Sequence, residues 1–418
     1  MESANLRNVA DRNGDESQAA FWRRISHISR EGKTFAAGAC LLAVLAATAG
    51  TVVGGRLKWR NEALAPMMVA GGGRDAPFLV RPAAFSMAGR EAGIDWLREP
   101  MRLPKGMIPR PTVCLHLMRI FGKDARLQID GFPSPISLLS LLTDEELSRK
   151  CMGTPTVVRT KHGIRFPTAS PAVRGRTPGD EAHRDQCLAC FAELGIPLSQ
   201  RIVAGQGAST LQCVLEDSLA NFHLQQNEIA WTALAYALYL PPVKQWKNRY
   251  GRVYCFDDLA NELLRRGLKG SCGGTHQLIS LTILLRVDAD SPILSEQVRT
   301  TARTYVGQLV NLAIRTQDSD GSWSIHWNHT PEQPLGAMEA SAADTPNSRL
   351  LITGHLAEWM TYLPVEGKVP DTTRKAAVSW LRQRLRRIDV RQFWDEFCPC
   401  THAICAIRDL SGEDGGSR

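Results

Sequence analysis

No convincing run of alternating apolar and polar residues occurs in the sequence, so sheet structure is not expected. Eleven cysteines are too few for a disulfide scaffold in a chain of 418 residues. No pair of potential ligands has the tight spacing of a zinc finger or of an HExxH helix. Strong local charge is also missing, because the net charge of +8 comes from basic residues that are spread along the chain. No nucleic-acid-binding motif accompanies them, and no nucleic-acid partner is expected.

The densest basic cluster lies at residues 382–391 (RQRLRRIDVR). Its leucines recur at helical spacing, with the basic residues between them. We interpret the cluster as the solvated face of a helix.

One long uncharged segment is present at residues 34–55, TFAAGACLLAVLAATAGTVVGG. Its 22 residues are enough to cross a bilayer as one helix. The polar tail before it, 1–33, is long for a signal peptide, which favours an uncleaved anchor, although ATA at 47–49 resembles a cleavage site. Basic residues flank both sides almost equally, so the positive-inside rule predicts no orientation. The expectation is a single-pass membrane protein anchored in the lipid bilayer through this segment.

The remaining chain divides into a Gly- and Pro-rich linker (56–110), a helical domain (111–410) and a short tail (411–418). Within the domain, nearly every periodic segment has the helical period. Helices are predicted at 112–122, 135–149, 183–194, 209–223, 227–240, 256–267, 275–286, 294–316, 353–363, 372–387 and 400–410.

The predicted helices are of two kinds, and the kinds alternate along the chain. WTALAYALYL, THQLISLTILL, GHLAEWMTYL and THAICAI are apolar on most faces, which predicts burial all round. FDDLANELLRRGL and TRKAAVSWLRQRLRRI are amphipathic, as surface helices are. Glu228 and His276 are 48 residues apart (276 − 228), and His355 and His402 are 47 apart (402 − 355). An all-α fold is therefore expected, an α/α toroid of hairpins with an inner and an outer layer.

A histidine recurs beside a threonine on three of the predicted inner helices, in GTH (His276), TGH (His355) and CTH (His402). The threonines are expected to cap the helix starts, which places each histidine near a helix N-terminus. Three imidazoles in one cavity would suit a zinc ion, with Cys272 or Cys400 as a further ligand. The alternative is that each pair is only a cap followed by a buried, hydrogen-bonded histidine.

Two glutamates lie on the same predicted helices. Glu358 is three residues after His355, on the same helical face, and Glu228 is three residues before Trp231. A carboxylate there could orient an imidazole or act as a general acid or base, so both are candidate catalytic residues. The alternative is a glutamate bonded to a neighbouring helix end.

QDSDGSW, Gln317 to Trp323, follows a long amphipathic helix and resembles the QW motif of squalene–hopene and oxidosqualene cyclases. In that family the Gln and the aromatic tie the end of an outer helix to the next repeat, and the Gly permits the turn. With the alternating helices, residues 110–410 resemble a terpenoid cyclase/protein prenyltransferase-type α/α toroid. The family's cavity lies near the inner-helix N-termini.

The cyclase chemistry of that family is not matched. The DxDD acid motif is absent, VDADSP (Asp288, Asp290) reads as a helix exit loop, and FDDLANE (Asp257, Asp258) reads as a helix N-cap. Aromatics make up 7% of the chain, few for a cavity that stabilises carbocations. Protein prenyltransferases and lanthionine cyclases hold a zinc ion with Cys and His, which resembles the set Cys272, His276, His355 and His402.

Three functions follow as hypotheses. The first is a membrane-anchored toroid with a central His/Cys cavity, zinc-dependent and acting on a lipid or a peptide. The second is a non-catalytic toroid that binds a ligand or a protein partner. The third is a terpenoid cyclase without the usual acid.

Overall fold

The computed structural model describes residues 73–80, 94, 96–168, 178–205, 207–242, 245–268, 271–328, 343–364 and 369–412. All of them belong to one compact unit, Leu64–Arg418. A separate unit, Met1–Ala63, lies outside the described residues, as do the predicted tail 1–33 and much of the predicted linker 56–110. The described part is mostly helical, with thirteen α-helices and nine short strands.

The expected membrane location is corrected by the structure. Among the described residues, no helix combines the length and the apolar character needed to span a bilayer. Even α12 (Glu296–Thr316, 21 residues) has only seven buried residues and bears charged ones. The segment on which the expectation rested, 34–55, lies outside the described residues.

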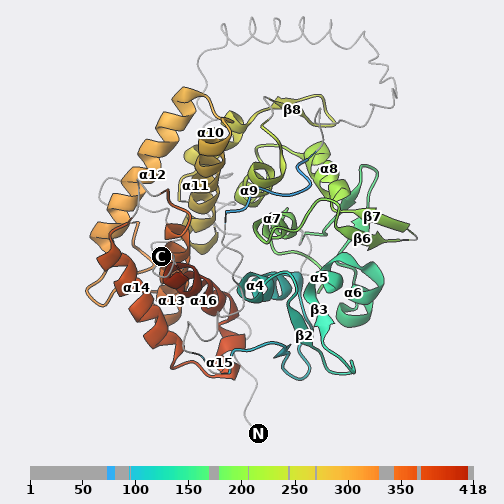
Figure 1. The fold of residues 1–418 in the computed structure, drawn as a ribbon, viewed down its shortest axis with the longest axis horizontal. Coiled ribbons are helices and arrows are strands. Elements are labelled where there is room, and N and C mark those ends of the chain that lie inside the picture. Colours follow the sequence, from blue (N-terminus) through green and yellow to red (C-terminus); the bar gives the residue numbers. More distant parts are fainter. Residues whose placement is uncertain are drawn as a thin grey trace, which may run out of the picture. The chain divides into compact units, whose positions relative to one another are not determined.

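Six helices contact one another in cyclic order and form what we call the inner ring (Figure 1). The last of them packs against the first, which closes the cycle. Burial follows the apolar composition: all eleven residues of α9 are buried, and thirteen of the sixteen in α11. The members are α4 (Pro111–Phe121), α7 (Gln186–Glu193), α9 (Ile229–Tyr239), α11 (Thr275–Asp290), α13 (Pro346–Met360) and α16 (Phe397–Gly412).

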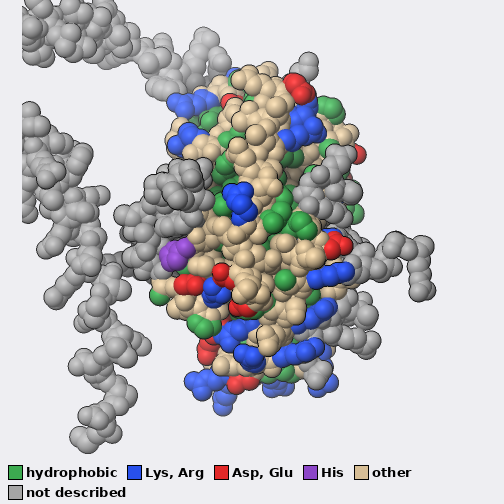
Figure 2. Space-filling model, turned by 90° about the vertical axis from the view of Figure 1, so that its left-hand side faces the viewer, with side chains coloured by type: hydrophobic (Ala, Val, Ile, Leu, Met, Phe, Trp, Pro, Cys, Tyr) green, Lys and Arg blue, Asp and Glu red, His purple; other side chains and the backbone are tan. Residues whose placement is uncertain are grey.

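The other helices lie around the inner ring (Figure 1). They bury one stripe each; α14, for example, buries five of its fifteen residues. Figure 2 shows one side of the molecule, on which Lys and Arg side chains are spread between apolar and acidic ones. These helices are α5 (Leu138–Thr143), α6 (Glu145–Met152), α8 (Gln212–Asn221), α10 (Phe256–Arg266), α12, α14 (Asp371–Leu385) and α15 (Val390–Asp395).

Short strands, which the sequence did not predict, form four small sheets. The longest strands have four residues, too few for alternation to be recognised in a sequence. They are β1 (Met101–Arg102), β2 (Arg126–Gln128), β3 (Ile136–Ser137), β4 (Val158–Arg159), β5 (Ile164–Arg165), β6 (Arg201–Ala204), β7 (Gly207–Thr210), β8 (Trp246–Lys247) and β9 (Val253–Tyr254). β1 pairs in parallel with β2, and the remaining pairs are antiparallel.

Most predicted helices are found within a few residues of their predicted ends. The main exception is α13, which begins at Pro346 rather than at 353, because a capping box at Thr345 and Ser348 starts the helix earlier. The predicted helix 135–149 is two helices, since Asp144 ends α5 and caps α6 through the N–H of Leu147. The short helix α15 was not predicted.

The Gln317–Trp323 segment joins two outer helices. The side-chain amide of Gln317 donates to the carbonyl of Gly321 (3.0 Å) and to that of Thr373 in α14 (2.9 Å). The indole of Trp323 is fully buried and donates to the carbonyl of Ala313 in α12 (2.8 Å). Gly321 has φ of 92° and lies against the α14 backbone, where a Cβ would be 2.5 Å from the Ala376 oxygen. The turn therefore holds α12 and α14 at close range.

The approach of that turn to α14 can be measured by substitution. Gly321→Ala is compared with Gly106→Ala, because Gly106 also has positive φ (80°) but nothing within 4 Å of its Cβ position. Both should lose about 1–2 kcal/mol of unfolding free energy through the left-handed backbone. Gly321→Ala should lose a further ~1–3 kcal/mol from the overlap. Urea unfolding gives both values, and equal losses would contradict the close approach.

A buried carboxyl organises the start of α7. Glu181 accepts the N–H groups of Asp185 (2.9 Å) and Cys187 (3.0 Å). Burial raises the pKa of Glu181 to about 8, with a contribution from the Asp185 carboxylate, and the two N–H groups oppose the shift. The folded chain therefore holds a proton on this carboxyl at pH values at which the unfolded chain has released it.

This proton makes stability depend on pH in a defined window. The pKa of Glu181 is about 8 in the folded chain and 4.5 ordinarily. The stabilisation that this proton provides is therefore complete below pH 4.5 and is lost as the pH rises towards 8. Relative to Glu181→Gln, the wild type should lose about 1.4 kcal/mol of unfolding free energy per pH unit in that window. Urea unfolding at several pH values tests this; parallel profiles for the two proteins would count against it.

Candidate metal centre

Six His and Cys side chains gather in two groups of three; five lie on inner-ring helices, and Cys272 lies just before α11. The His402 group consists of His116, Cys398 and His402, and the His276 group of Cys272, His276 and His355. Within each group, the potential ligand atoms all lie within 4.8 Å of one another. Among the described residues, these are the sets of His, Cys, Asp and Glu that could hold a metal ion.

Both groups are built on the same local pattern, Cys-x-x-Thr-His. It occurs as CGGTH from Cys272 to His276 and as CPCTH from Cys398 to His402. The threonine hydroxyl donates to the carbonyl of its own cysteine in both, at 2.8 Å for Thr275 and 2.9 Å for Thr401. Cys and His are four residues apart, so each pattern can present both side chains to one point.

The third member of each group comes from the next inner-ring helix. His355 on α13 joins the pattern that opens α11, and His116 on α4 joins the one that opens α16. The ring contacts between α11 and α13, and between α16 and α4, therefore complete the groups.

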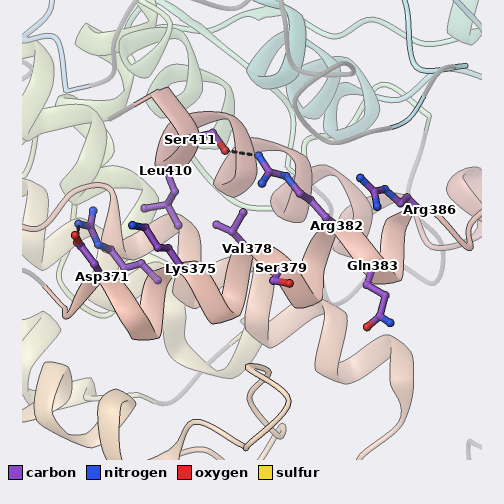
Figure 3. Close-up of a pocket in the computed structure, with 10 residues that line it drawn as sticks. Asp371, Lys375, Val378, Ser379, Arg382, Gln383, Arg386, Leu410 and Ser411 are labelled. Atoms are coloured by element: carbon purple, nitrogen blue, oxygen red, sulfur yellow. Dashed lines mark hydrogen bonds and ion pairs between the residues drawn. The ribbon is translucent and has the colours of Figure 1, made fainter. Parts of the chain in front are cut away.

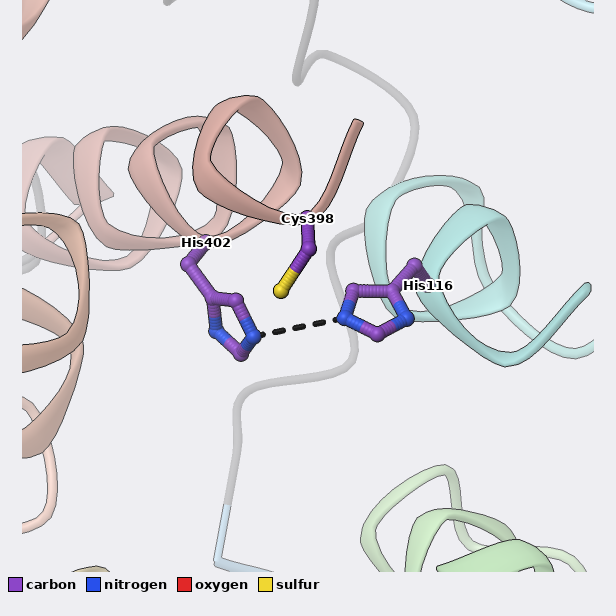
Figure 4. Close-up of side chains that lie close together, drawn as sticks. All are labelled: His116, Cys398 and His402. Atoms are coloured by element: carbon purple, nitrogen blue, oxygen red, sulfur yellow. Dashed lines mark hydrogen bonds between the residues drawn. The ribbon is translucent and has the colours of Figure 1, made fainter. Parts of the chain in front are cut away.

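Figure 4 shows the three side chains of the His402 group, whose imidazoles are oriented by hydrogen bonds to residues outside it. Nδ1 of His116 donates to the carbonyl of Thr112 (2.7 Å), and Nδ1 of His402 lies 2.6 Å from the Glu358 carboxylate. Carbonyl and carboxylate oxygens only accept, so both imidazoles carry a proton on Nδ1. The two Nε2 atoms face each other at 3.3 Å. If both imidazoles are neutral, the lone pairs of the two Nε2 atoms point at each other and repel. A proton shared between the nitrogens, or a bound cation, removes this repulsion.

Cys398 has thiolate character. Its hydrogen bond with Cys272 holds the pKa of the Cys398 thiol well below its ordinary value, and the imidazoles of His116 and His402 act in the same direction against burial. The same bond and burial raise the pKa of Cys272. A thiolate is the form in which cysteine binds metals. The contact between the two sulfurs also joins the two groups.

The His276 group contains two buried nitrogens without a hydrogen bond. Nδ1 of His355 donates to the carbonyl of Leu351 (2.8 Å), so its Nε2 carries a lone pair, and that atom has no hydrogen-bond partner. Nδ1 of His276 has none either and lies 3.6 Å from Glu228. Burial, with the neighbouring His402, lowers the pKa of His355 well below its ordinary value, which keeps it neutral.

The predicted glutamates both contact this cluster. Glu358 bridges His402 and Arg119, with 3.0 Å to the guanidinium, and therefore orients an imidazole on the next helix rather than that of His355. Glu228 lies 3.6 Å from His276 and 4.0 Å from His183. Glu228 has a left-handed backbone, φ 51°, which is uncommon outside glycine. Such conformations often occur at functional sites.

A buried ion network lies behind Glu358. Arg119 of α4 pairs with Glu358 (3.0 Å) and with Glu193 of α7 (3.3 Å). The hydroxyl of Tyr362 donates to Glu193 (2.7 Å). One guanidinium is therefore shared by two buried carboxylates.

A small pocket adjoins the cluster. Arg119, Glu193, His276 and His402 form its polar part, and Trp231, Leu234 and Ile279 are among its apolar lining residues. Its cavity volume is about 10 Å³, room for roughly one water molecule.

A second, larger groove lies on the surface (Figure 3). Arg374, Lys375 and Arg382 of α14 line it together with the end of α16, where Arg382 donates to Ser411 (2.7 Å). No member of either His/Cys group lines it.

The structure brings all of the predicted ligands, Cys272, His276, His355 and His402, into the two groups. Cys400, the other predicted candidate, belongs to neither, and burial raises its pKa to about 12. The threonines do not cap the helix starts: α11 begins after Gly274, α13 begins well before His355, and Thr353 accepts the N–H of Trp323 (3.0 Å).

Cys398 and His116 are the functional candidates that were not predicted as ligands. The repeated Cys-x-x-Thr-His pattern is a signal that could have identified Cys398. His116 lies alone in the apolar run VCLHLM, and nothing in that run marks it as a ligand.

The aspartates that were compared with the acid motifs of the cyclases have structural roles. Asp288 accepts the N–H groups of Ile293 (2.9 Å) and Leu294 (2.8 Å) and pairs with Arg299. It follows His276 by twelve residues on α11, which places it about 18 Å along the helix. Asp258 caps α10 through the N–H of Cys255 (2.8 Å).

Comparison with protein families, with curated proteins and with solved structures found no match to the chain.

The ion network predicts a large cost for removing its guanidinium. Arg119→Met leaves Glu193 and Glu358 buried without their shared cation, and the unfolding free energy should fall by about 3–5 kcal/mol. The matched control Arg149→Met breaks an exposed pair with Glu145 and should cost under ~1 kcal/mol. Adding Glu193→Gln to Arg119→Met should restore part of the loss. Urea unfolding measures all three variants, and equal costs for the two single variants would contradict the assignment.

Proposed function

We propose that the protein is a zinc-dependent enzyme whose active site lies inside an α/α toroid of helical hairpins. The cyclic contacts of the six inner-ring helices support the toroid. The resemblance of Gln317–Trp323 to a QW motif also supports it, because this segment ties α12 to α14. The proposed metal ligands are His116, Cys398 and His402.

The separation of the two Nε2 atoms carries this proposal. Two nitrogens that bind one tetrahedral zinc ion at 2.0–2.1 Å lie about 3.3–3.4 Å apart. The Nε2 atoms of His116 and His402 are 3.3 Å apart, and both are aimed by hydrogen bonds at their Nδ1 atoms. Zinc-binding histidines usually have such an outer hydrogen bond to a carbonyl or a carboxylate.

The donor set fits zinc in a catalytic role. Imidazole and thiolate together favour zinc over the hard cations magnesium and calcium. Three protein ligands leave a fourth position, the arrangement of catalytic rather than structural zinc sites. A water molecule bound there would have a pKa near 7 and would be a nucleophile at neutral pH.

The surrounding residues have distinct tasks in this proposal. Glu358 orients His402 and raises the electron density of its imidazole. Arg119, Trp231 and Leu234 line the pocket beside His402. The proposed substrate is a lipid or a peptide whose reacting group approaches this pocket, and the cavity of about 10 Å³ is too small for a folded polyprene. Asp288, far along α11, supplies no acid for cyclisation.

Catalysis can be tested with an activated ester. The zinc-loaded full chain should hydrolyse 4-nitrophenyl acetate, and His402→Ala should remove this activity together with the bound zinc. Glu358→Gln keeps the ligands but weakens the outer hydrogen bond, so the rate should fall by roughly 10–100-fold. Release of 4-nitrophenolate measures the rate, and elemental analysis measures the zinc.

The control is His162→Ala, which changes a histidine outside both groups and should leave rate and zinc unchanged. Circular dichroism verifies that each variant is folded. A zinc-loaded wild type no faster than folded His402→Ala would disprove the catalytic role.

A further inference from the structure

The two Cys-x-x-Thr-His patterns share three local features, although Cys398 lies inside α16 and Cys272 precedes α11. Each opens an inner-ring helix, each threonine bonds back to its cysteine, and each takes a histidine from the next helix of the ring. The Cys-x-x-Thr-His turn that is proposed to bind a metal ion at Cys398 and His402 is therefore repeated at Cys272 and His276.

Two imidazole nitrogens of the His276 group are buried, and leaving them without a ligand costs free energy. His355 is fully buried, and its Nε2 lone pair has no hydrogen-bond partner among the described residues. Nδ1 of His276 is likewise buried without one. An unsatisfied buried polar atom costs about 1–3 kcal/mol, so two of them in one group of metal-ligand type call for a bound species.

The backbone is also strained to place the sulfur. Cys272 has φ of 55°, and Gly273 and Gly274 continue with 65° and 74°. A left-handed conformation at a non-glycine residue costs about 1–2 kcal/mol. At Gly274 a Cβ would lie 2.3 Å from the backbone of Leu268, so the glycine is required by the turn. The turn directs Cys272 into the group with His276 and His355.

We propose that Cys272, His276 and His355 bind a second zinc ion, so that the protein carries a two-metal centre. The inference rests on the proposed function, since it adds an ion beside the one held by His116, Cys398 and His402. The rings of His355 and His402 are 3.6 Å apart between centroids, so the two groups are adjacent. Two-metal enzymes use such neighbouring ions to bind the attacking and the leaving oxygen together.

Charge balance supports two ions. Two divalent cations bring four positive charges, and the thiolates that Cys272 and Cys398 would form on binding them supply two negative ones. Glu358, 2.6 Å from His402, and Glu228, 3.6 Å from His276, supply the other two. Arg119 is offset by Glu193, to which it is paired. The centre with two zinc ions is therefore neutral, as a buried site needs to be.

Metal stoichiometry tests the inference on the full chain. The protein is stripped with a chelator, loaded with Zn²⁺, freed of excess metal by gel filtration and analysed for zinc per chain. The expected value is two. His276→Ala and His116→Ala should each retain one, the double variant none, and His162→Ala two.

Cobalt provides a second readout that is specific for the sulfurs. With Co²⁺ in place of zinc, thiolate-to-cobalt absorption should fall to about half in Cys272→Ser and in Cys398→Ser. Circular dichroism selects the variants that are folded.

The outcomes separate the two proposals. One zinc per wild-type chain, lost in His116→Ala and kept in His276→Ala, overturns the second ion and leaves the proposed function standing. No zinc at all overturns both. Two ions in His276→Ala would place the second ion elsewhere and also refute the inference.

Discussion

The packing of α16 against α4 is the contact on which the rest of the site depends. Arg408 of α16 donates to the carbonyl oxygens of Arg119 (2.6 Å) and Ile120 (3.1 Å), in the last turn of α4. Helix ends leave such carbonyls without intrahelical partners, and a buried guanidinium satisfies two of them at once. Because this bond sets the position of the two helices, it also places His116 beside His402.

Polar contacts extend from this junction through the inner ring. Glu358 links the imidazole of His402 to Arg119, and Arg119 reaches Glu193 on α7. The orientation of His402 is thus coupled to α7, which supplies no member of either group. In a buried site this coupling has a chemical consequence, since each anchored Nδ1 decides which nitrogen faces the centre. The network determines the direction of the lone pairs as well as the packing.

The helical layers and four of the six clustered histidines and cysteines could be predicted from the sequence, because both follow from strong local patterns. The all-round apolar composition of α9 and α11 predicted their burial, and the Thr-His pairs led to His276, His355 and His402. The features that the sequence did not predict depend on contacts between segments far apart in the chain. The capping of α13 at Thr345 moved the helix start away from His355. His116 becomes a candidate only when α16 lies against α4, and the four-residue strands are too short to produce a period.

The positions of the ligands along the chain imply an order of assembly. His116 and His402 are 286 residues apart, so joining them closes a loop whose entropic cost is on the order of 5 kcal/mol. Cys272 and His355 are 83 residues apart (355 − 272), and their group can form on a shorter stretch of chain. During synthesis, His116 leaves the ribosome long before Cys398 exists to complete its group. Occupancy of the His402 group by the proposed metal ion would therefore report that α16 has docked against α4, a late step in the maturation of the chain.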